Sequence, residues 1–270
     1  MVTKRSVGNL SVTILQFAHA QRSAEQLAGV FPTLGRETLE GIVTGHGDGY
    51  PWSFNGVIVD SGEAVFLVDT GFGFRSTGTG TPTAELLAEA GYDAEAITSI
   101  ILTHGHGDHV GGLRDEGKRS FPGAEIVVTM AERDHWTGQP SSPAAAALAA
   151  YDGQIRLIDS GELIYEGESG SIRAIPAPGH TPGHIGLDLR SGNEGLRLLA
   201  DTVHTLFQLD DLTLSPSFDS DGKQAACTRQ ALLTEAAENC RLIGLFHYPF
   251  PGIGRLTRTD TNRLVWTPAE

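Results

Sequence analysis

The stretch TSIILTHGHGDHVGG, residues 98–112, determines most of what this chain can build. Its first residues, 98–102, form a short apolar and β-branched run, which predicts a buried strand. Three histidines and one aspartate follow that run within six positions: His104, His106, Asp108 and His109. Imidazole and carboxylate groups are natural ligands for zinc and similar divalent ions. The stretch therefore predicts a metal site at a strand end, with Gly105 and Gly107 allowing the backbone to fold sharply.

A polar residue that follows an apolar run recurs further along the chain. The additional candidates are His180 in GHTPGH (179–184), Asp201 directly after the run 196–200, and His247 directly after the run 242–246. Two metal ions need more ligands than the first motif supplies. Because strands hold ligands more rigidly than loops do, we expect all seven side chains at one edge of the sheets.

Composition excludes several classes of function. The chain has 270 residues, with 19 Lys and Arg against 33 Asp and Glu, so its formal net charge is −14. This charge argues against a nucleic-acid partner, because the phosphate backbone is bound by clustered basic residues. No apolar run approaches the roughly 18 residues that a membrane span needs, so no membrane partner is expected.

The two cysteines do not predict a disulfide. Cys227 and Cys240 fall within a segment, 222–240, that has the pattern of one helix, which would hold them roughly 20 Å apart. We expect two buried thiols on one face of that helix. Polar residues interrupt the N-terminal apolar stretch, so it does not form a signal peptide, and a cytoplasmic location is expected.

Periodicity indicates many strands with a few helices between them. The predicted strands are 10–17, 56–60, 64–68, 98–102, 125–129, 155–158, 172–175, 185–189, 196–200 and 241–246. The predicted helices are 24–28, 82–90, 143–151 and 222–240, and 45–51 is expected to be irregular. This pattern predicts an α+β protein in which one sheet packs on another and helices lie outside.

The four motifs together resemble those of the metallo-β-lactamase superfamily. The stretch H-x-H-x-D-H at 104–109, GHTPGH at 179–184, Asp201 and His247 match its metal-binding motifs in order and spacing. From about residue 55 onward, the resemblance implies an αββα sandwich of two mixed β-sheets flanked by helices, with a dinuclear centre at one edge. It also implies a division of ligands: His104, His106 and His180 for the first ion, Asp108, His109 and His247 for the second, and Asp201 bridging both.

Further features resemble the branch that contains methyl parathion hydrolase and related dinuclear lactonases. They are the ending HYPFPGIGRL at 247–256, the segment Phe218-Asp219-Ser220-Asp221, and His204, three residues after Asp201. Shorter acyl-homoserine-lactone lactonases carry a tyrosine where His204 stands. The resemblance implies a hydrolase of small esters, above all lactones or organophosphate triesters.

The expected nucleophile is a hydroxide held between two divalent ions, because a bound ion lowers the pKa of water from about 15.7 toward 7. Zinc is the expected metal, with manganese, iron and cobalt as alternatives. Asp108 is the candidate for passing a proton to the leaving group, and His204 for a hydrogen bond to substrate. Two alternatives stay open: a persulfide-dioxygenase-type oxidoreductase with a single iron, and a non-catalytic binding module stapled by metal.

Other residues are assigned supporting roles. Asp69, after the run 64–68, is expected either to orient a ligand histidine or simply to form a turn, and His184 to pack beside the metal loop. The aromatic candidates for binding a small-molecule ester or lactone are Phe74, Trp136, Phe207 and Phe250. We expect one domain over 1–270, in which 1–54 form an N-terminal extension that serves as a lid or as the arm of a homodimer.

Overall fold

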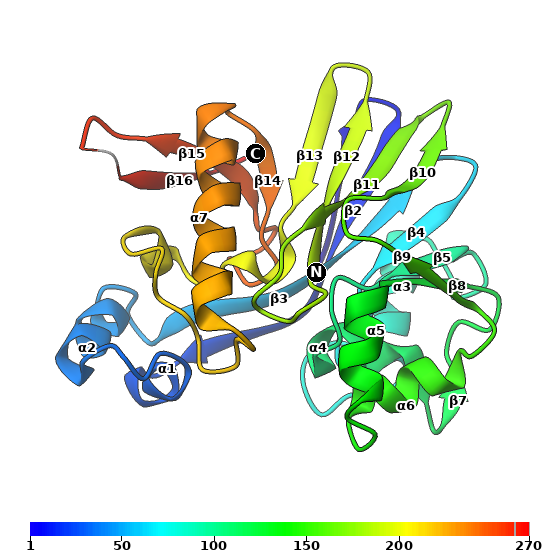
Figure 1. The fold of residues 1–270 in the computed structure, drawn as a ribbon, viewed down its shortest axis with the longest axis horizontal. Coiled ribbons are helices and arrows are strands. Elements are labelled where there is room, and N and C mark those ends of the chain that lie inside the picture. Colours follow the sequence, from blue (N-terminus) through cyan, green and yellow to red (C-terminus); the bar gives the residue numbers. More distant parts are fainter. Residues whose placement is uncertain (262, 270) are drawn as a thin grey trace.

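The computed structural model describes residues 1–261 and 263–269. Within them, two seven-stranded sheets face each other, and helices cover the outer faces (Figure 1). The first sheet has the order β1-β2-β3-β4-β5-β8-β9. Its strands are β1 (Val2–Val7), β2 (Leu10–Arg22), β3 (Tyr50–Asp60), β4 (Val65–Val68), β5 (Ser99–Ile101), β8 (Glu125–Thr129) and β9 (Ile155–Ile158).

The second sheet runs in sequence order from β10 to β16. Its strands are β10 (Leu163–Gly167), β11 (Gly170–Pro176), β12 (Ile185–Ser191), β13 (Glu194–Leu198), β14 (Leu242–Gly244), β15 (Ile253–Arg258) and β16 (Leu264–Pro268). Each sheet combines antiparallel pairs with parallel ones, such as β4 with β5 and β13 with β14. The predicted αββα sandwich of two mixed sheets is confirmed.

Helices pack on both outer faces of the sandwich (Figure 1). The helices are α1 (Ala24–Val30), α2 (Arg36–Thr44), α3 (Thr83–Ala90), α4 (Gly107–Val110), α5 (Met130–Thr137), α6 (Pro143–Ala150) and α7 (Gly222–Glu238). The pair α1 and α2 differs from the others, because it lies beside the end of β2 and the start of β3 (Figure 1). Short 3-10 turns cover Gly111–Leu113, Ala200–Thr202 and Leu206–Leu209, and a small hairpin joins β6 (Arg114–Asp115) to β7 (Lys118–Arg119). In the described chain, no helix combines the length and apolarity that crossing a bilayer requires.

The strands of the first sheet carry apolar side chains on both faces, because one face packs on the second sheet and the other packs on helices. In β3, Val57 and Val59 belong to the core between the sheets, whereas Ile58 faces the helices. The same division separates Val127 of β8 from Ile126 and Val128. Because both faces are covered, these strands form nearly continuous apolar runs rather than alternating ones. Full burial of such a side chain contributes about 1.5–3 kcal/mol to stability.

Residues 1–54 are attached to the first sheet along much of their length. β2 pairs with β1 on one side and with β3 on the other. Ser23 caps α1 through a reciprocal capping box. Residues 45–51 are not wholly irregular, because Tyr50 and Pro51 already pair with β2. That residues 1–54 serve as a lid or as a dimer arm stays a prediction.

The two cysteines are free, as predicted, but the prediction that both thiols are buried is wrong. Cys227 and Cys240 are both exposed. The buried face of α7 carries Ala225, Arg229 and Leu233 among others, and Cys227 lies off that face. Cys240 lies beyond the helix, in the left-handed region with φ of 48°.

The strands β15 and β16 were not predicted from the sequence. Both have several exposed residues, so their sequences lack a strong apolar signal.

Candidate metal centre

The candidate ligands lie in segments that follow four strands. His104 and its neighbours follow β5, His180 follows β11, Asp201 follows β13 and His247 follows β14. β4 and β5 are parallel, as are β13 and β14, so the carboxyl ends of each pair lie at one edge of its sheet. The two edges face each other, and this brings side chains more than a hundred residues apart into one cluster.

Close packing fixes the first ligand loop. A Cβ on Gly105 would lie 2.3 Å from Trp136 Nε1, and one on Gly112 would lie 2.1 Å from the Thr70 carbonyl oxygen. These glycines are needed because neighbouring groups occupy the space of a side chain. Gly107 has no neighbour within 4 Å of such a Cβ, so the role expected for it is not supported by packing.

Three histidine nitrogens form a tight triangle. His106 Nδ1 lies 3.0 Å from His104 Nε2 and 3.0 Å from His180 Nε2, and the last two are 3.1 Å apart. A neutral imidazole has one N–H and one lone pair, so three converging nitrogens offer lone pairs to one ion. This is the group expected for the first metal.

A second group lies beside the triangle. Asp108 Oδ2 is 3.4 Å from His109 Nε2 and 3.8 Å from His247 Nε2. Asp201 Oδ2 stands between the groups, 3.4 Å from His180 Nε2 on one side and 2.9 Å from His247 Nε2 on the other. One carboxylate oxygen therefore contacts both groups, which is the placement that a bridging ligand requires.

The donors fit divalent cations. His109 Nε2 and Asp201 Oδ1 are buried and lack a hydrogen-bond partner among the described residues. Leaving buried polar atoms unpaired costs about 1–3 kcal/mol each, and more for charged groups. Cations bound by these atoms would satisfy both of them. The cluster is thus a dinuclear site of His and Asp donors in its chemistry as well as its geometry.

Partners on the other ring nitrogen set the orientation of the ligand imidazoles. His109 Nδ1 lies 2.7 Å from Asp69 Oδ2, and Asp69 also accepts hydrogen bonds from the amide and hydroxyl of Thr103. His247 Nδ1 lies 2.9 Å from the Ser53 carbonyl oxygen. An N–H donated from Nδ1 leaves the Nε2 lone pair free for a metal. Asp69 occupies the orienting position proposed for it.

A buried chain supports His180 in the same way. His180 Nδ1 lies 2.8 Å from Asp219 Oδ1, and Asp219 Oδ2 lies 3.6 Å from an Nη of Arg229. Arg229, on α7, donates through Nε to the Thr202 carbonyl oxygen. Sequence reasoning missed these roles: Asp219 stood in a quoted motif, but nothing in the sequence indicated that a buried Arg229 would reach it.

Glu132 connects two ligand loops and was also missed. Its side chain is 1% exposed. Oε1 accepts from the Gly105 amide at 2.9 Å, and Oε2 accepts from the Thr181 hydroxyl at 2.7 Å and the Gly183 amide at 3.0 Å. The carboxylate thus holds the loop of His104 and the loop of His180 together. No local pattern marks it, because its role depends on how α5 packs against both loops.

Burial lowers the pKa of some of these histidines, whereas neighbouring carboxylates raise the pKa of His109 and His180. Burial lowers the pKa of His106 and of His184 to about 3. Neutral imidazole is the form that binds metal. For His180, burial also disfavours the charge, but hydrogen bonds to Asp201 and Asp219 outweigh it and raise the pKa to about 9. At Asp108, the attraction of His109 outweighs burial and holds the pKa of the carboxyl below its usual range.

His184 and His204 lie at the rim of the cluster. His184 Nδ1 lies 2.9 Å from the Ala177 carbonyl oxygen, so this residue hydrogen-bonds beside the metal loop as proposed. His204 Nε2 is 3.3 Å from Asp201 Oδ2, and its ring stacks on that of His247 with centroids 4.9 Å apart. His204 Nε2 therefore lies beside the Asp201 oxygen that contacts both donor groups, although His204 is not among the residues that line the neighbouring cavity.

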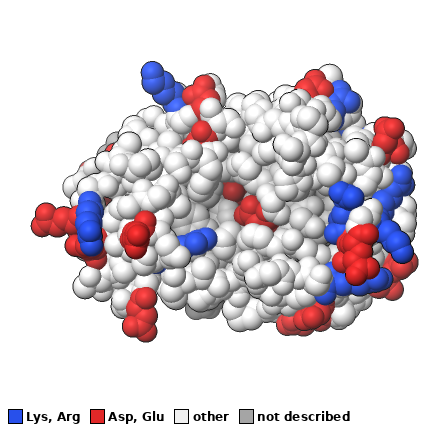
Figure 2. Space-filling model, turned by 90° about the horizontal axis from the view of Figure 1, so that it is seen from below, with Lys and Arg blue, Asp and Glu red and all other residues white. Residues whose placement is uncertain are grey.

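A cavity of about 510 Å³ opens onto the cluster. Its lining includes His106, Asp108, Asp201 and His247 together with Arg22, Trp52, Phe54, Phe72 and Phe218. Figure 2 shows the molecule hollowed on this side, with acidic atoms at the hollow.

The aromatics proposed from the sequence do not form that wall. Phe74 packs in the core against Phe121, and Phe207 packs against Phe31 and Tyr50. Phe250 packs against the core between the sheets. Trp136 contacts the His106 ring with centroids 5.5 Å apart, but it lies outside the cavity lining. Proximity to the ligands in sequence did not identify the cavity wall, because the direction of a side chain depends on its position in its turn or strand.

Comparison with protein families matches residues 49–235 to the metallo-beta-lactamase superfamily. Together with the sandwich and its His and Asp cluster, this match shows that the chain belongs to the metallo-beta-lactamase superfamily.

Several curated proteins are similar in sequence. The uncharacterized protein YobT of Bacillus subtilis is 32% identical over 167 residues, 55% of this chain and 66% of that protein. An N-acyl homoserine lactonase of Bacillus cereus is 29% identical over 140 residues, 50% of each chain. A hydroxyacylglutathione hydrolase of Xanthomonas euvesicatoria is 26% identical over 188 residues, 69% of this chain and 59% of that one. The chain spans 34% to 66% of the length of several such relatives.

Two solved structures resemble the fold over its whole length. AidC, a dizinc quorum-quenching lactonase in complex with a product, has a TM-score of 0.88 and 26% identity, covering 100% of this chain and 97% of that chain. AbOPH, a hydrolase in the beta lactamase superfamily, has a TM-score of 0.86 and 24% identity with the same coverage. At 24% identity, the similarity to AbOPH shows the fold alone.

Proposed function

We propose that this protein is a dinuclear metal-dependent hydrolase of small esters, with lactones as its main substrates. The observation that supports this most is Asp201 Oδ2, whose position between the two donor groups suits it to hold two ions side by side. Two divalent ions in such a site supply an activated water nucleophile and a Lewis acid for the carbonyl oxygen. Zinc is the metal we propose, and manganese, iron or cobalt accept the same donors.

The protein's own residues would manage the proton and the leaving group. Hydrolysis of a lactone adds a hydroxyl to the acyl carbon, breaks the ring C–O bond and places a proton on the released oxygen. The Asp108 side chain is 20% exposed and lines the cavity, so it can carry that proton from water to the released oxygen. Burial lowers the pKa of His204 to about 4, so its neutral ring can donate one hydrogen bond to a substrate oxygen.

The cavity wall supports a substrate with an apolar part. Trp52, Phe54 and Phe72 present aromatic surface beside the metal cluster, and this suits an acyl chain or an aryl group. The similarity to a protein named as an N-acyl homoserine lactonase and to a dizinc lactonase favours lactones. Organophosphate triesters are a second class, since they too are neutral esters with an oxygen that a Lewis acid can polarise.

The test is metal analysis combined with a substrate panel. Metal per chain is measured first, and γ-lactones, δ-lactones, aryl esters and phosphotriesters are then assayed before and after chelation. We expect two ions per chain and lactone hydrolysis that disappears with the metal and returns with it. Activity that survives complete metal removal would contradict the proposal.

Two other outcomes would select the alternative functions. A single iron with oxygen consumption in the presence of a thiol persulfide would indicate the oxidoreductase. Full metal occupancy without any hydrolysis would indicate a binding module. A cytoplasmic location and a homodimer stay predictions.

A further inference from the structure

A second cavity lies toward the opposite ends of the strands that carry the metal ligands. Its volume is about 320 Å³, and five arginines line it: Arg5, Arg190, Arg197, Arg241 and Arg255. β13 shows the separation, because Glu194 at its start lines this cavity while its far end leads to Asp201. The linings of the two cavities share no described residue. So many arginines in one place are unexpected in a chain with a net charge of −14.

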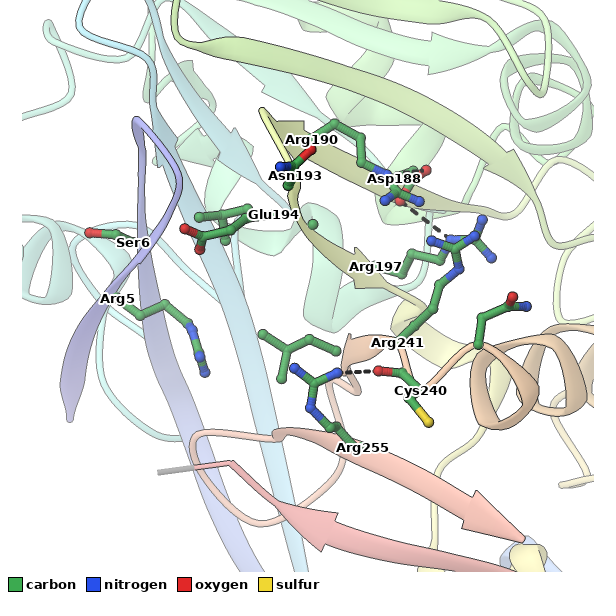
Figure 3. Close-up of a pocket in the computed structure, with 14 residues that line it drawn as sticks. Arg5, Ser6, Asp188, Arg190, Asn193, Glu194, Arg197, Cys240, Arg241 and Arg255 are labelled. Atoms are coloured by element: carbon green, nitrogen blue, oxygen red, sulfur yellow. Dashed lines mark hydrogen bonds and ion pairs between the residues drawn. The ribbon is translucent and has the colours of Figure 1, made fainter.

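Carboxylates engage three of the five guanidinium groups. Asp188 accepts from Arg190 Nε at 3.0 Å and from Arg197 Nε at 3.3 Å. Glu235 pairs with Arg197 and with Arg241. These contacts hold the three arginines on one side of the cavity, around Asp188 (Figure 3). These ion pairs give the three arginines a structural role.

Arg5 and Arg255 differ from the other three. Among the described residues, neither has a carboxylate within ion-pair distance. The Arg5 Nε is buried and lacks a hydrogen-bond partner, and Arg255 donates to the Cys240 carbonyl oxygen. Figure 3 shows the two side chains extending toward the same space from β1 and β15. Burial, and then the charge of Arg255, lower the pKa of the Arg5 guanidinium.

The charges leave room for a dianion. Among the described residues, three carboxylates accompany the five arginines, namely Asp188, Glu194 and Glu235, and they leave two of the five positive charges uncompensated. Guanidinium groups bind phosphate and carboxylate through paired hydrogen bonds. A phosphomonoester has three free oxygens, and inorganic phosphate has four, to share between two guanidiniums on different strands, whereas one carboxylate has two. A cavity of about 320 Å³ suits a small molecule rather than a macromolecule.

We propose that this cavity binds a phosphate group, through Arg5 and Arg255, at a site separate from the metal centre. The group belongs either to a free phosphate ion or to a small phosphomonoester. Arg190, Arg197 and Arg241 keep the surrounding potential positive while remaining paired with their carboxylates. This site does not depend on the hydrolase activity proposed above.

Cys240 provides a local test, because it lines the cavity and is exposed. The metal-loaded protein is treated with iodoacetamide at constant pH, and alkylation of each cysteine is followed by mass spectrometry. At ten times its dissociation constant, inorganic phosphate should slow alkylation of Cys240 about tenfold by mass action. Cys227 is exposed but outside the cavity lining, so its rate should not change. Equal slowing by sodium chloride at the same ionic strength would overturn the proposal.

Variants and a second ligand complete the experiment. The double variant Arg5→Gln with Arg255→Gln should lose protection, and the double variant Arg36→Gln with Arg133→Gln, which removes the same charge outside this cavity, should keep it. Both should keep the metal content of the original protein. Protection by glycerol phosphate but not by glycerol would assign the site to a phosphomonoester, and protection by inorganic phosphate alone would assign it to the free ion. Protection that persists in the first double variant, or no protection by either phosphate, would refute it.

Discussion

The metal cluster and the aromatic wall above it are built by different means. Ligand imidazoles are fixed by a hydrogen bond on the nitrogen that faces away from the cluster, as His109 is by Asp69 and His180 by Asp219. Phe72, in the wall, makes an edge contact with Phe54 at 4.9 Å between centroids. Hydrogen bonds fix the orientation of each ligand side chain, whereas apolar contacts in the wall fix only the volume of the cavity. Changes in the cluster should therefore alter metal binding and rate, whereas changes in the wall should alter substrate affinity.

The largest effect should come from the bridging carboxylate. Asp201→Asn removes a charge that contacts both donor groups, and we expect loss of at least one ion per chain. The transition state of the proposed hydrolysis should lose about 4 kcal/mol of stabilisation, which lowers kcat/KM about a thousandfold. Asp188→Asn, which alters a carboxylate paired with arginines far from the cluster, is the control and should leave both quantities unchanged. Full metal content and normal activity in the Asp201 variant would remove the basis of the proposal.

Asp219→Asn should have the next largest effect, because it weakens the support of His180. Changes to such outer partners cost about 10- to 100-fold in metal affinity or activity. Asp221→Asn, two residues away, is a matched control, since Asp221 caps α7 and asparagine caps equally well. Competition with a chelator measures the affinity of each variant. Equal affinities for the two variants would show that Asp219 does not position His180.

Glu132→Gln should affect stability more than chemistry. The glutamine side chain would turn its NH₂ group toward a backbone N–H donor, that of Gly105 or Gly183. One buried donor would then be left unpaired. We expect a loss of about 1–3 kcal/mol in the free energy of unfolding. Each kcal/mol corresponds to about 2–4 °C in Tm. Glu125→Gln, at an exposed position of β8, should leave Tm unchanged. A stable Glu132 variant would mean that the two loops are held by other contacts.

The smallest effect should come from the wall. Phe72→Leu should raise KM for long-chain lactones about fivefold, equivalent to about 1 kcal/mol of lost apolar contact, with kcat unchanged. Phe74→Leu is a sharp control, because Phe74 lies two residues away but is packed in the core against Phe121. That variant should lower Tm and leave KM alone. The reverse pattern would show that the cavity has been assigned to the wrong residues.

Sequence was sufficient where function is encoded locally. His104 to His109 fall within six positions after one strand, and the other proposed ligands each follow an apolar run, so residue type and spacing were enough to select the candidate donors. Ser142 and Ser23 cap the starts of α6 and α1 through equally local hydrogen bonds. The fold class followed from the density of apolar runs.

Tertiary contacts explain what the sequence could not reveal. Glu132 and Arg229 act through loops that lie far from them in sequence, so no spacing points to them. Trp52 and Phe54 stand two apart on β3, which places them on one side of the strand, and this alternation was the available but unused signal for the wall. Cys227 shows the same limit, since helical spacing alone did not reveal which face of α7 is covered.

Anomalous diffraction from crystals of the metal-loaded protein tests the central claim most directly. The account predicts two metal peaks about 3.5–4 Å apart. One should be bound by His104, His106 and His180, the other by Asp108, His109 and His247, with Asp201 touching both. A single fully occupied peak, or ions bound away from Asp201, would contradict it.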